Sequence, residues 1–409
     1  MLGIIAGLVN RSPSMRLACI ADDLTGATDL GVTLAREGLS VIQVNGVPQR
    51  SLDIPAVDAV VVALKSRTNP AAEAVRWSLE SLEWLRGRGA ERIYFKYCST
   101  FDSTPRGNIG PVADALLDAL GERFTVATPA YPRNGRTVYK GNLFVGDVPL
   151  AESGMKDHPL TPMRDSNLVR VLAAQTRRPV GLIPCELVER GPDAICEKFS
   201  TMQGFAILDA VRDEHLIALG QACRNMKLIT GGAGLAMGIA RAIGVQGMKA
   251  RDFPRMGGPA VILAGSCSQA TLGQIEAWKG PALQLDPAKL DPASALAWIT
   301  DHLSANPLVY ASAPPERIAR GKGEAIEHAF RDIARGLAAR GVRKFVVAGG
   351  ETSGAVVEAL GVRALAIGPE IDPGVPWTAA VGGEPYLLAL KSGNFGGRDF
   401  FAKALEMVR

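Results

Sequence analysis

The sequence is poor in the residues that build metal centres and disulfide frameworks. Its 409 residues include six cysteines and four histidines. No two cysteines have the CxxC spacing and the histidines lack metal-ligand spacing, which argues against a zinc site. Scattered cysteines in apolar surroundings are typical of reduced thiols packed as small hydrophobic side chains. We therefore expect free thiols and a cytoplasmic location.

Long apolar runs and an excess of one charge are also missing. No apolar segment approaches the ~20 residues needed to span a bilayer, so no membrane partner is expected. The net charge of +4 comes from 45 basic and 41 acidic residues without a basic run, which argues against nucleic acid as a partner. A hydrophobic content of 47% with 21% charged residues is typical of a globular enzyme, and the length favours two domains.

Two common nucleotide-binding motifs are absent as well. No GxGxxG motif follows a predicted strand, which disfavours a dinucleotide-dependent dehydrogenase. The GxxxxGK[ST] motif is absent too, so the chain has no Walker A loop.

Short apolar runs alternate with amphipathic helices along the chain, which predicts an α/β fold with largely parallel sheets. Strands are expected at residues 17–20, 57–64, 92–97, 124–127, 180–183, 204–208, 227–229, 260–264, 308–312 and 344–348, and helices at 71–88, 109–120, 324–340 and 352–360. Residues 129–163 are rich in proline and glycine and are expected to form one long functional loop. Periodicity stops around residues 244–259, which indicates a domain boundary.

The first candidate site is an acidic pair directly after the first strand. Asp22 and Asp23 are predicted to lie at the carboxyl end of that strand, where open α/β sheets bind their ligands. Adjacent acids repel each other unless a metal ion, a substrate hydroxyl or a nearby Lys or Arg satisfies them. The alternative is structural: one Asp caps the following helix and the other is solvated.

A second cluster of polar residues connects the strand at 92–97 to the helix at 109–120. Lys96 and Arg106 suit a carboxylate, whereas Asp102 and Ser103 suit hydroxyl groups, so the cluster predicts an anionic, polyhydroxylated ligand. The alternative is a helix-capping network around Ser103 and Asn108, with Arg106 solvated.

Glycine-rich turns suggest where phosphate binds. Residues 349–354 read GGETSG between a strand and a helix, a pattern that aims backbone N–H groups at an anion. Two similar turns, at 264–268 and 391–397, follow other C-terminal segments, and the three together could wrap a nucleotide. A fourth turn, at 230–234, is left open between close helix–strand packing and ligand contact.

Taken together, these segments resemble the four-carbon acid sugar kinase family, and within it the subgroup that acts on 3-oxo-tetronate. The matching segments cover nearly all of residues 16–402: 21–29, 96–110, 129–142, 158–167, 208–209, 230–234, 265–268, 349–354 and 391–396. The subgroup assignment depends mainly on 158–167 and 391–396. Residues 1–14 have no counterpart in this pattern. We therefore interpret residues 1–15 as an extension, disordered or a mis-assigned start, with Met15 as the natural start.

The resemblance implies a domain organisation and a reaction. It implies a sugar-acid-binding domain (16–245), a linker (246–259) and a nucleotide-binding domain (260–409), with the active site in the cleft between the domains. The reaction is phosphorylation of the terminal C4 hydroxyl by ATP with Mg²⁺. The partners are then the sugar acid and ATP, and a homodimer is left open.

The expected site residues follow from these motifs. Asp22 and Asp23 are expected to be catalytic, and no set of protein metal ligands is expected. The expected substrate-binding residues are Lys96, Asp102, Ser103, Arg106, Lys140 and Asp209. The expected nucleotide-binding residues are Ser266, Gly349, Gly350, Glu351, Thr352, Ser353, Gly393 and Gly396.

Three questions stay open at the level of sequence. Asp22 or Asp23 could accept the proton of the C4 hydroxyl or hold Mg²⁺ through water. The acid is expected to be 3-oxo-tetronate rather than D-threonate or D-erythronate, because residues 158–167 lie in the long loop that would fold over it. A sugar-acid sensor without catalysis is the remaining alternative.

Overall fold

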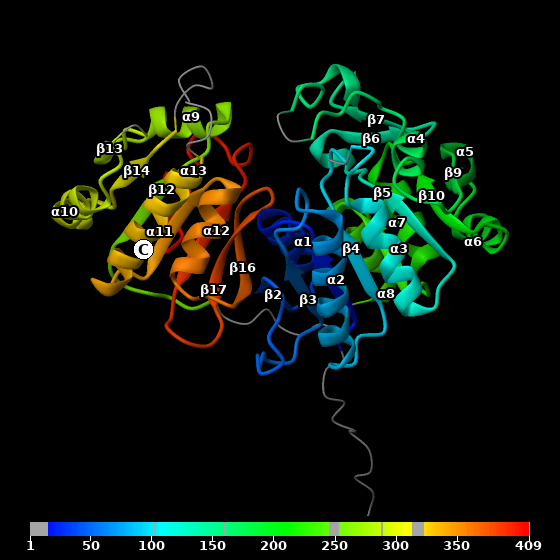
Figure 1. The fold of residues 1–409 in the computed structure, drawn as a ribbon, viewed down its shortest axis with the longest axis horizontal. Coiled ribbons are helices and arrows are strands. Elements are labelled where there is room, and N and C mark those ends of the chain that lie inside the picture. Colours follow the sequence, from blue (N-terminus) through cyan, green and yellow to red (C-terminus); the bar gives the residue numbers. More distant parts are fainter. Residues whose placement is uncertain are drawn as a thin grey trace, which may run out of the picture.

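A single long sheet runs through both halves of the chain in the computed structural model, with helices packed against it (Figure 1). The structure describes residues 15–101, 104–158, 161–244, 253–287, 289–312 and 323–408. The expected extension before Met15 and residues 246–252 of the expected linker lie outside these ranges. The prediction of an α/β fold with largely parallel strands is confirmed.

The strands that the N-terminal half contributes to the long sheet are parallel to one another. Central strands such as β1 and β3 are buried at every residue, as expected for apolar runs covered on both faces. Their order across the sheet is β2 (Val41–Asn45), β3 (Ala59–Ala63), β1 (Leu17–Ala21), β4 (Ile93–Lys96), β11 (Leu228–Gly231), β5 (Phe124–Thr128), β10 (Gly204–Leu208) and β9 (Val180–Ile183).

The C-terminal half has a parallel part and an antiparallel part. The parallel strands, in order, are β13 (Ala282–Gln284), β14 (Leu308–Tyr310), β12 (Ala260–Ala264), β15 (Lys344–Ala348) and β18 (Leu387–Lys391). Next to β18 lie β17 (Val375–Ala380) and then β16 (Ala364–Asp372), both in antiparallel pairings. β16 also pairs with β2, Leu365 opposite Gln43, and this pairing joins the two halves into one sheet.

Strands β16 and β17 are absent from the sequence prediction, because prolines interrupt their pattern. Pro369 lies within β16 and Pro376 within β17, and the register shifts between Ile367 and Glu370. Bulges of this kind accommodate a residue that cannot donate to the ladder.

Helices of the N-terminal half form two packed groups. One contains α1 (Leu24–Arg36), α7 (Asp213–Cys223) and α8 (Ala233–Ile243), and the other contains α2 (Ala71–Arg86), α3 (Ile109–Leu120) and α4 (Leu168–Ala173). The close approach of α8 to the chain after β5 requires glycine, since a Cβ on Gly234 would lie 2.2 Å from the carbonyl oxygen of Ala130. The turn at 230–234 therefore serves packing.

The remaining helices are shorter or belong to the C-terminal half. The C-terminal helices are α9 (Gln269–Ala277), α10 (Pro292–His302), α11 (Gly323–Ala339), α12 (Gly350–Ala359) and α13 (Phe400–Glu406). The others are α5 (Cys185–Val188), α6 (Pro192–Ser200) and the 3₁₀ segments η1 (Pro132–Asn134), η2 (Leu150–Glu152) and η3 (Leu303–Ala305). Within the described ranges, no helix is both long and apolar enough to cross a membrane.

The expectation of one long loop at residues 129–163 is wrong for its central part. β6 (Arg136–Tyr139), β7 (Asn142–Val145) and β8 (Val148–Pro149) form a small antiparallel sheet there. Its first turn consists of Lys140 and Gly141, both with positive φ (51° and 73°). Two-residue turns of this hand match the twist of a hairpin, so a short sheet can form in a segment rich in glycine.

All six cysteines lie within the described residues, and all are free thiols.

Candidate active site

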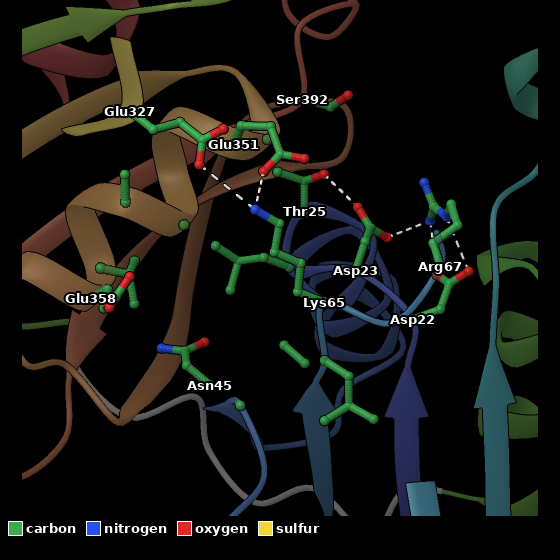
Figure 2. Close-up of a pocket in the computed structure, with 18 of the residues that line it drawn as sticks. Asp22, Asp23, Thr25, Asn45, Lys65, Arg67, Glu327, Glu351, Glu358 and Ser392 are labelled. Carbon is green, nitrogen blue, oxygen red and sulfur yellow. Dashed lines mark hydrogen bonds and ion pairs between the residues drawn. The ribbon is translucent and has the colours of Figure 1, made fainter. Parts of the chain in front are cut away.

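A cavity of about 510 Å³ opens between the two halves at the carboxyl ends of β1 and β3 (Figure 2). A cleft at this place is what the sequence predicted. The N-terminal half contributes Asp22, Asp23, Thr25, Lys65, Arg67, Thr68, His158 and Thr161, among others. The C-terminal half contributes Glu327, Arg331, Gly350, Glu351, Gly354, Glu358 and Ser392, among others.

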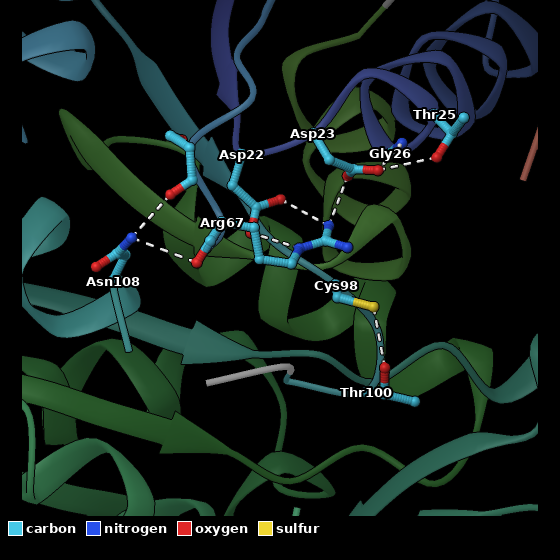
Figure 3. A network of polar contacts seen from close by, with 9 residues as sticks. Asp22, Asp23, Thr25, Gly26, Arg67, Cys98, Thr100 and Asn108 are labelled. Carbon is cyan, nitrogen blue, oxygen red and sulfur yellow. Dashed lines mark hydrogen bonds and ion pairs between the residues drawn. The ribbon is translucent and has the colours of Figure 1, made fainter. Parts of the chain in front are cut away.

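Arg67 binds both members of the acidic pair (Figure 3). Its Nε donates to Asp22 Oδ2 at 3.0 Å and its Nη2 to Asp22 Oδ1 at 2.8 Å. The same Nη2 donates to Asp23 Oδ1 at 2.5 Å. Asp23 also caps α1, because its Oδ2 accepts from Gly26 N at 3.1 Å and from Thr25 Oγ1 at 2.8 Å. A cation therefore satisfies the adjacent acids, and one of them is also a helix cap.

Sheet register brings Arg67 to the acids. Ala21 at the end of β1 lies opposite Ala63 at the end of β3, so the segments that follow these strands are neighbours. The backbone N–H groups of Ser66 and Arg67 donate to the carbonyl of Asp22 at 2.9 and 3.2 Å. The loop that carries Arg67 is thereby attached to the acidic pair.

Asn108 holds the same loop from its other side. Its Nδ2 donates to the carbonyls of Ser66 at 2.8 Å, Arg67 at 3.3 Å and Asn69 at 2.8 Å. Asn108 stands at the start of α3 but its side chain makes no capping bond there. Asn108 therefore does not cap the helix, as the structural alternative proposed, but positions the loop that carries Arg67.

The two carboxyls differ electrostatically. Burial raises the pKa of Asp22, although Arg67 opposes the shift. Burial acts in the same direction on Asp23, but Arg67 and Lys96 outweigh it and lower the pKa of Asp23. The Asp23 side chain is 25% exposed, whereas that of Asp22 is 7% exposed. Asp23 is therefore the more exposed carboxylate of the pair and the one whose pKa is lowered.

Lys96 lies behind the acidic pair rather than in the cavity lining. It is buried at the end of β4, and a Cβ on Gly26 would lie 2.9 Å from its Nζ. Asp29 lies on the next turn of α1, and burial raises its pKa to about 6. The charge of Lys96 acts in the opposite direction and limits this rise. Lys96 therefore supplies positive charge beneath the first turns of α1.

The other predicted substrate-binding residues lie outside the cavity lining or outside the described residues. Asp102 and Ser103 are not among the described residues. Arg106 is exposed, and its backbone N–H donates to Thr104 Oγ1 at 3.3 Å. The described lining includes neither Arg106, Lys140 nor Asp209.

Lys140 and Asp209 meet each other at the base of the small sheet. The buried carboxylate of Asp209 accepts from the backbone N–H groups of Lys140 at 2.7 Å, Gly141 at 2.9 Å and Cys185 at 3.1 Å. The side chain of Lys140 pairs with Glu186. The geometry of Asp209 is that of a carboxylate which fixes a hairpin turn.

The segment singled out for substrate choice does reach the cavity. His158 and Thr161 both line it, and His158 Nδ1 lies 3.0 Å from Thr161 Oγ1 and 3.1 Å from Thr161 N. Residues 159 and 160 are outside the described part of the chain. Both residues thus contribute to the lining from the N-terminal half, as the acidic pair does.

The three C-terminal glycine turns come together as predicted. A Cβ on Gly349 would lie 3.1 Å from Ser266 N, and one on Gly393 would lie 2.1 Å from Ser266 Oγ. Gly349 also has φ +123°, which favours glycine. The side chains of Ser268 and Thr271 donate to the carbonyl of Gly393 at 2.5 and 3.0 Å. These contacts lock the turns against one another.

Lys391 anchors the last of these turns from inside the domain. Its fully buried Nζ donates to Thr271 Oγ1 at 2.9 Å and to the carbonyls of Ser392 at 3.1 Å and Gly393 at 2.9 Å. Burial lowers the pKa of Lys391 to about 7. Gln274 adds three hydrogen bonds of 3.0 Å to the carbonyls of residues 395–397.

Only part of the predicted nucleotide-binding set faces the cavity. Gly350 and Glu351 line it, and Ser392 lines it from the turn that also contains Gly393. Thr352 and Ser353 are buried in the first turns of α12. Ser266, Gly349, Gly393 and Gly396 shape the turns behind the described lining.

The N-termini of α1 and α12 approach the same space. The first N–H groups of α12, like those of any helix, have no intrahelical partner, and its N-cap, Gly349, offers no side chain to cap them. A Cβ on Gly350 would meet only Thr25 Oγ1, at 3.9 Å, which places the start of α1 beside it. The start of α1 is capped by Asp23, whereas the uncapped, positive start of α12 favours an anionic ligand.

A group of potential metal ligands lies elsewhere, at Cys185, Glu189 and His215. Arg212 Nη2 contacts His215 Nε2 at 2.9 Å and Glu189 Oε1 at 3.1 Å. A guanidinium therefore already holds two of these three groups, which disfavours a metal ion there. No such group lies among the described residues of the cavity.

The sequence prediction missed Arg67, Asn108 and Lys65 as site residues. Lys65 and Arg67 follow a predicted strand, and the rule that ligands bind at the carboxyl ends of strands could have drawn attention to them. The role of Asn108 had no local signal, because its three acceptors belong to a loop about 40 residues earlier in the chain.

Two family models match this chain. Residues 17–239 match a sugar-binding N-terminal domain, and residues 261–401 match a nucleotide-binding C-terminal domain. The matched ranges correspond to the two halves that enclose the cavity.

Curated relatives are similar over nearly the whole chain. The 3-oxo-tetronate kinase of Burkholderia multivorans is 52% identical over 416 residues, which cover 96% of this chain and 97% of that protein. The 3-oxo-tetronate kinase of Methylobacterium radiotolerans is 52% identical over 422 residues, covering 97% of this chain and 100% of that protein.

A solved structure shares the fold. The crystal structure of a Haemophilus influenzae protein, 45% identical, superimposes with a TM-score of 0.81 and covers 96% of this chain and 100% of that chain. The resemblance noted in the sequence is thereby confirmed. The chain belongs to the four-carbon acid sugar kinase family, which combines a sugar-binding N-terminal domain with a nucleotide-binding C-terminal domain.

Proposed function

We propose that this protein transfers the terminal phosphoryl group of ATP to the C4 hydroxyl of 3-oxo-tetronate. One observation carries the proposal: the acidic pair and the uncapped N-terminus of α12 face the same cavity, with Thr25 beside Gly350. The relatives named 3-oxo-tetronate kinase, about 50% identical over the whole chain, support the same activity.

The N-terminal side of the cavity suits the sugar acid. Asp23 offers an ionised carboxylate to a hydroxyl, and Arg67, His158 and Thr161 provide hydrogen-bonding groups around it. We propose that the substrate-binding roles expected for Arg106, Lys140 and Asp209 are indirect in this arrangement, since these residues lie outside the described lining.

The C-terminal side suits the phosphates of ATP. Free N–H groups at the start of α12 can bind phosphate oxygens, helped by the helix dipole. The carboxylates of Glu327 and Glu351 are the kind of ligand that Mg²⁺ takes together with phosphate oxygens and water. Mg²⁺, when bound, would neutralise charge on the phosphates.

Asp23 is the group that we assign to the proton of the acceptor hydroxyl. The oxygen at C4 forms a bond to the terminal phosphorus as the bond from that phosphorus to the bridging oxygen of ADP breaks, and the hydroxyl proton goes to the Asp23 carboxylate. A loose transition state needs orientation more than a strong base, so a carboxylate with a lowered pKa is adequate. Asp22 keeps Arg67 in place beside it.

Competition between acids tests the substrate. The ketone at C3 accepts hydrogen bonds but cannot donate them, whereas a C3 hydroxyl does both. A site that presents only donors there can discriminate by as much as ~10⁴-fold in kcat/KM. We expect ADP release with 3-oxo-tetronate to exceed that with D-threonate or D-erythronate. Preference for threonate would contradict the substrate but not the kinase, and no ADP release with any four-carbon acid would favour a sensor.

Substitution of Gly350 tests the nucleotide side. Gly350→Val should fold, because a Cβ there meets nothing closer than 3.9 Å, but its side chain would cover the free N–H groups of α12. We expect the Kd for ATP to rise about tenfold or more, as for one lost charge-assisted hydrogen bond, and the Kd for the acid to stay unchanged. Calorimetry with each ligand measures both. Gly273→Val, at an equally open glycine of α9 outside the described lining, is the control.

A further inference from the structure

The Lys65 side chain belongs to the sugar-acid side of the cavity and reaches across to the nucleotide side. It follows β3 by two residues, and its Nζ pairs with Glu351 in the first turn of α12 and lies 3.7 Å from Glu327 Oε2 on α11. Figure 2 shows Nζ between these two acids. One ion pair thus crosses the cavity at the place where the two helix N-termini meet.

Two other cations of the described lining have different partners. Arg67 is bound to Asp22 and Asp23, and Arg331 Nη2 donates to Glu358 Oε2 at 2.8 Å. Lys65 differs because both of its acids belong to the nucleotide side while its backbone belongs to the loop that carries Arg67. Burial acts against its charge, but Glu351 and Glu327 raise the pKa of Lys65, so its ammonium is charged at neutral pH.

The exposure of the Lys65–Glu351 ion pair allows Lys65 to exchange these acids for another anion. Lys65 and Glu351 side chains are 71% and 61% exposed, and exposed ion pairs contribute little to stability. A polyphosphate at the start of α12 would approach the carboxylates of Glu351 and Glu327, which repel it. Beside the Mg²⁺ that these carboxylates would hold, the Lys65 ammonium can bind the phosphate directly, and contacts between an ammonium and phosphate are strong.

We propose that Lys65 binds Glu351 and Glu327 in the free enzyme and the terminal phosphate of ATP in the complex. The inference depends on the proposed function and adds to it a phosphate-binding residue supplied by the sugar-acid domain. We assign Lys65 to the terminal phosphate because that phosphate must lie between the start of α12 and Asp23. Thr25 marks this place, since it donates to Asp23 and lies next to Gly350.

The test is calorimetry on the full-length chain with Mg·ATP, Mg·ADP and the sugar acid in separate titrations. Lys65→Met is expected to raise the Kd for ATP roughly 10- to 100-fold, as for the loss of a hydrogen bond between charged groups. The Kd values for ADP and for the acid are expected to stay within about twofold of wild type, so the ratio of ATP to ADP affinity falls. Lys65→Arg, which keeps the charge, should restore most of the ATP affinity.

Lys227→Met is the matched control. Lys227 is also exposed and paired, with Nζ 2.7 Å from Glu122 Oε1, and it is not part of the described lining. An equal loss of ATP and ADP affinity in Lys65→Met, or a lower Tm with unchanged ATP binding, would overturn the proposal. Wild-type protein that binds no ATP would instead refute the proposed function, so the two failures are distinguishable.

Discussion

Replacement of Arg67 by methionine is expected to lower the free energy of unfolding by about 3 kcal/mol and to abolish turnover. Arg67 satisfies two adjacent carboxylates, of which Asp22 is buried, and removal of one partner from a buried ion pair typically costs ~3–5 kcal/mol. The lower end applies because Arg67 and Asp23 are 22% and 25% exposed. Urea denaturation followed by circular dichroism measures the loss.

The pH dependence of that loss has a defined sign. Without Arg67, the pKa values of both carboxyls in the folded variant rise, so the folded state takes up protons more readily than the unfolded chain as pH falls. The stability difference from wild type should therefore be largest above neutral pH and shrink toward acid pH. A difference that does not change with pH would contradict the ion-pair explanation.

Arg178→Met is the control for Arg67→Met. Arg178 also bridges two acids, Asp114 at 3.0 Å and Asp118 at 2.5 Å, and it has a similar exposure of 26%. It lies outside the described lining, so its removal should leave kcat and KM unchanged. Loss of activity in both variants to the same degree would indicate a general effect on folding.

Replacement of Asp23 by asparagine is expected to lower kcat by roughly 10²–10⁴-fold while the fold stays intact. Asparagine is as good a helix cap as aspartate, so α1 keeps its cap, whereas the variant loses the carboxylate that accepts the proton. Steady-state kinetics with ATP and 3-oxo-tetronate measure the loss.

Asp291→Asn provides the matched control for this substitution. Asp291 caps α10 by accepting from Ala293 N and Ser294 N at 3.1 Å, and it lies outside the described lining of the cavity. The same chemical change at this cap should leave kcat unaltered. If Asp23→Asn also kept the wild-type kcat, Asp23 would be a helix cap alone and the assignment of the proton acceptor would be wrong.

Features that depend on neighbouring residues were predictable from the sequence. The strand at residues 344–348 and the helix at 109–120 match β15 and α3, because apolar runs and helical periodicity are local patterns. The position of Asp22 and Asp23 at the end of a strand was predictable for the same reason. The glycine turns at 264–268, 349–354 and 391–397 also meet as expected, since strand ends in a parallel sheet share one edge.

Features that depend on distant pairings were not predictable. Arg67 lies about 45 residues after the acids that it binds, and although its place after a predicted strand puts it at the ligand-binding edge of the sheet, nothing local identifies Asp22 and Asp23 as its partners. Lys140 and Asp209 have the residue types of a ligand site. The Asp209 carboxylate, however, accepts hydrogen bonds from three backbone N–H groups, which come together around it only in the folded protein.

The sequence by itself determined the class of fold, the acidic pair at the end of the first strand, the glycine-rich turns and the resemblance to a kinase family. The tertiary structure decided which cation meets the acids and which halves enclose the cavity. It did so through sheet register, because the alignment of Ala21 with Ala63 places Arg67 beside Asp22, and the pairing of β2 with β16 brings α12 next to α1. Local patterns specify strands and turns, but pairing between strands far apart in the chain depends on the packing of the whole core.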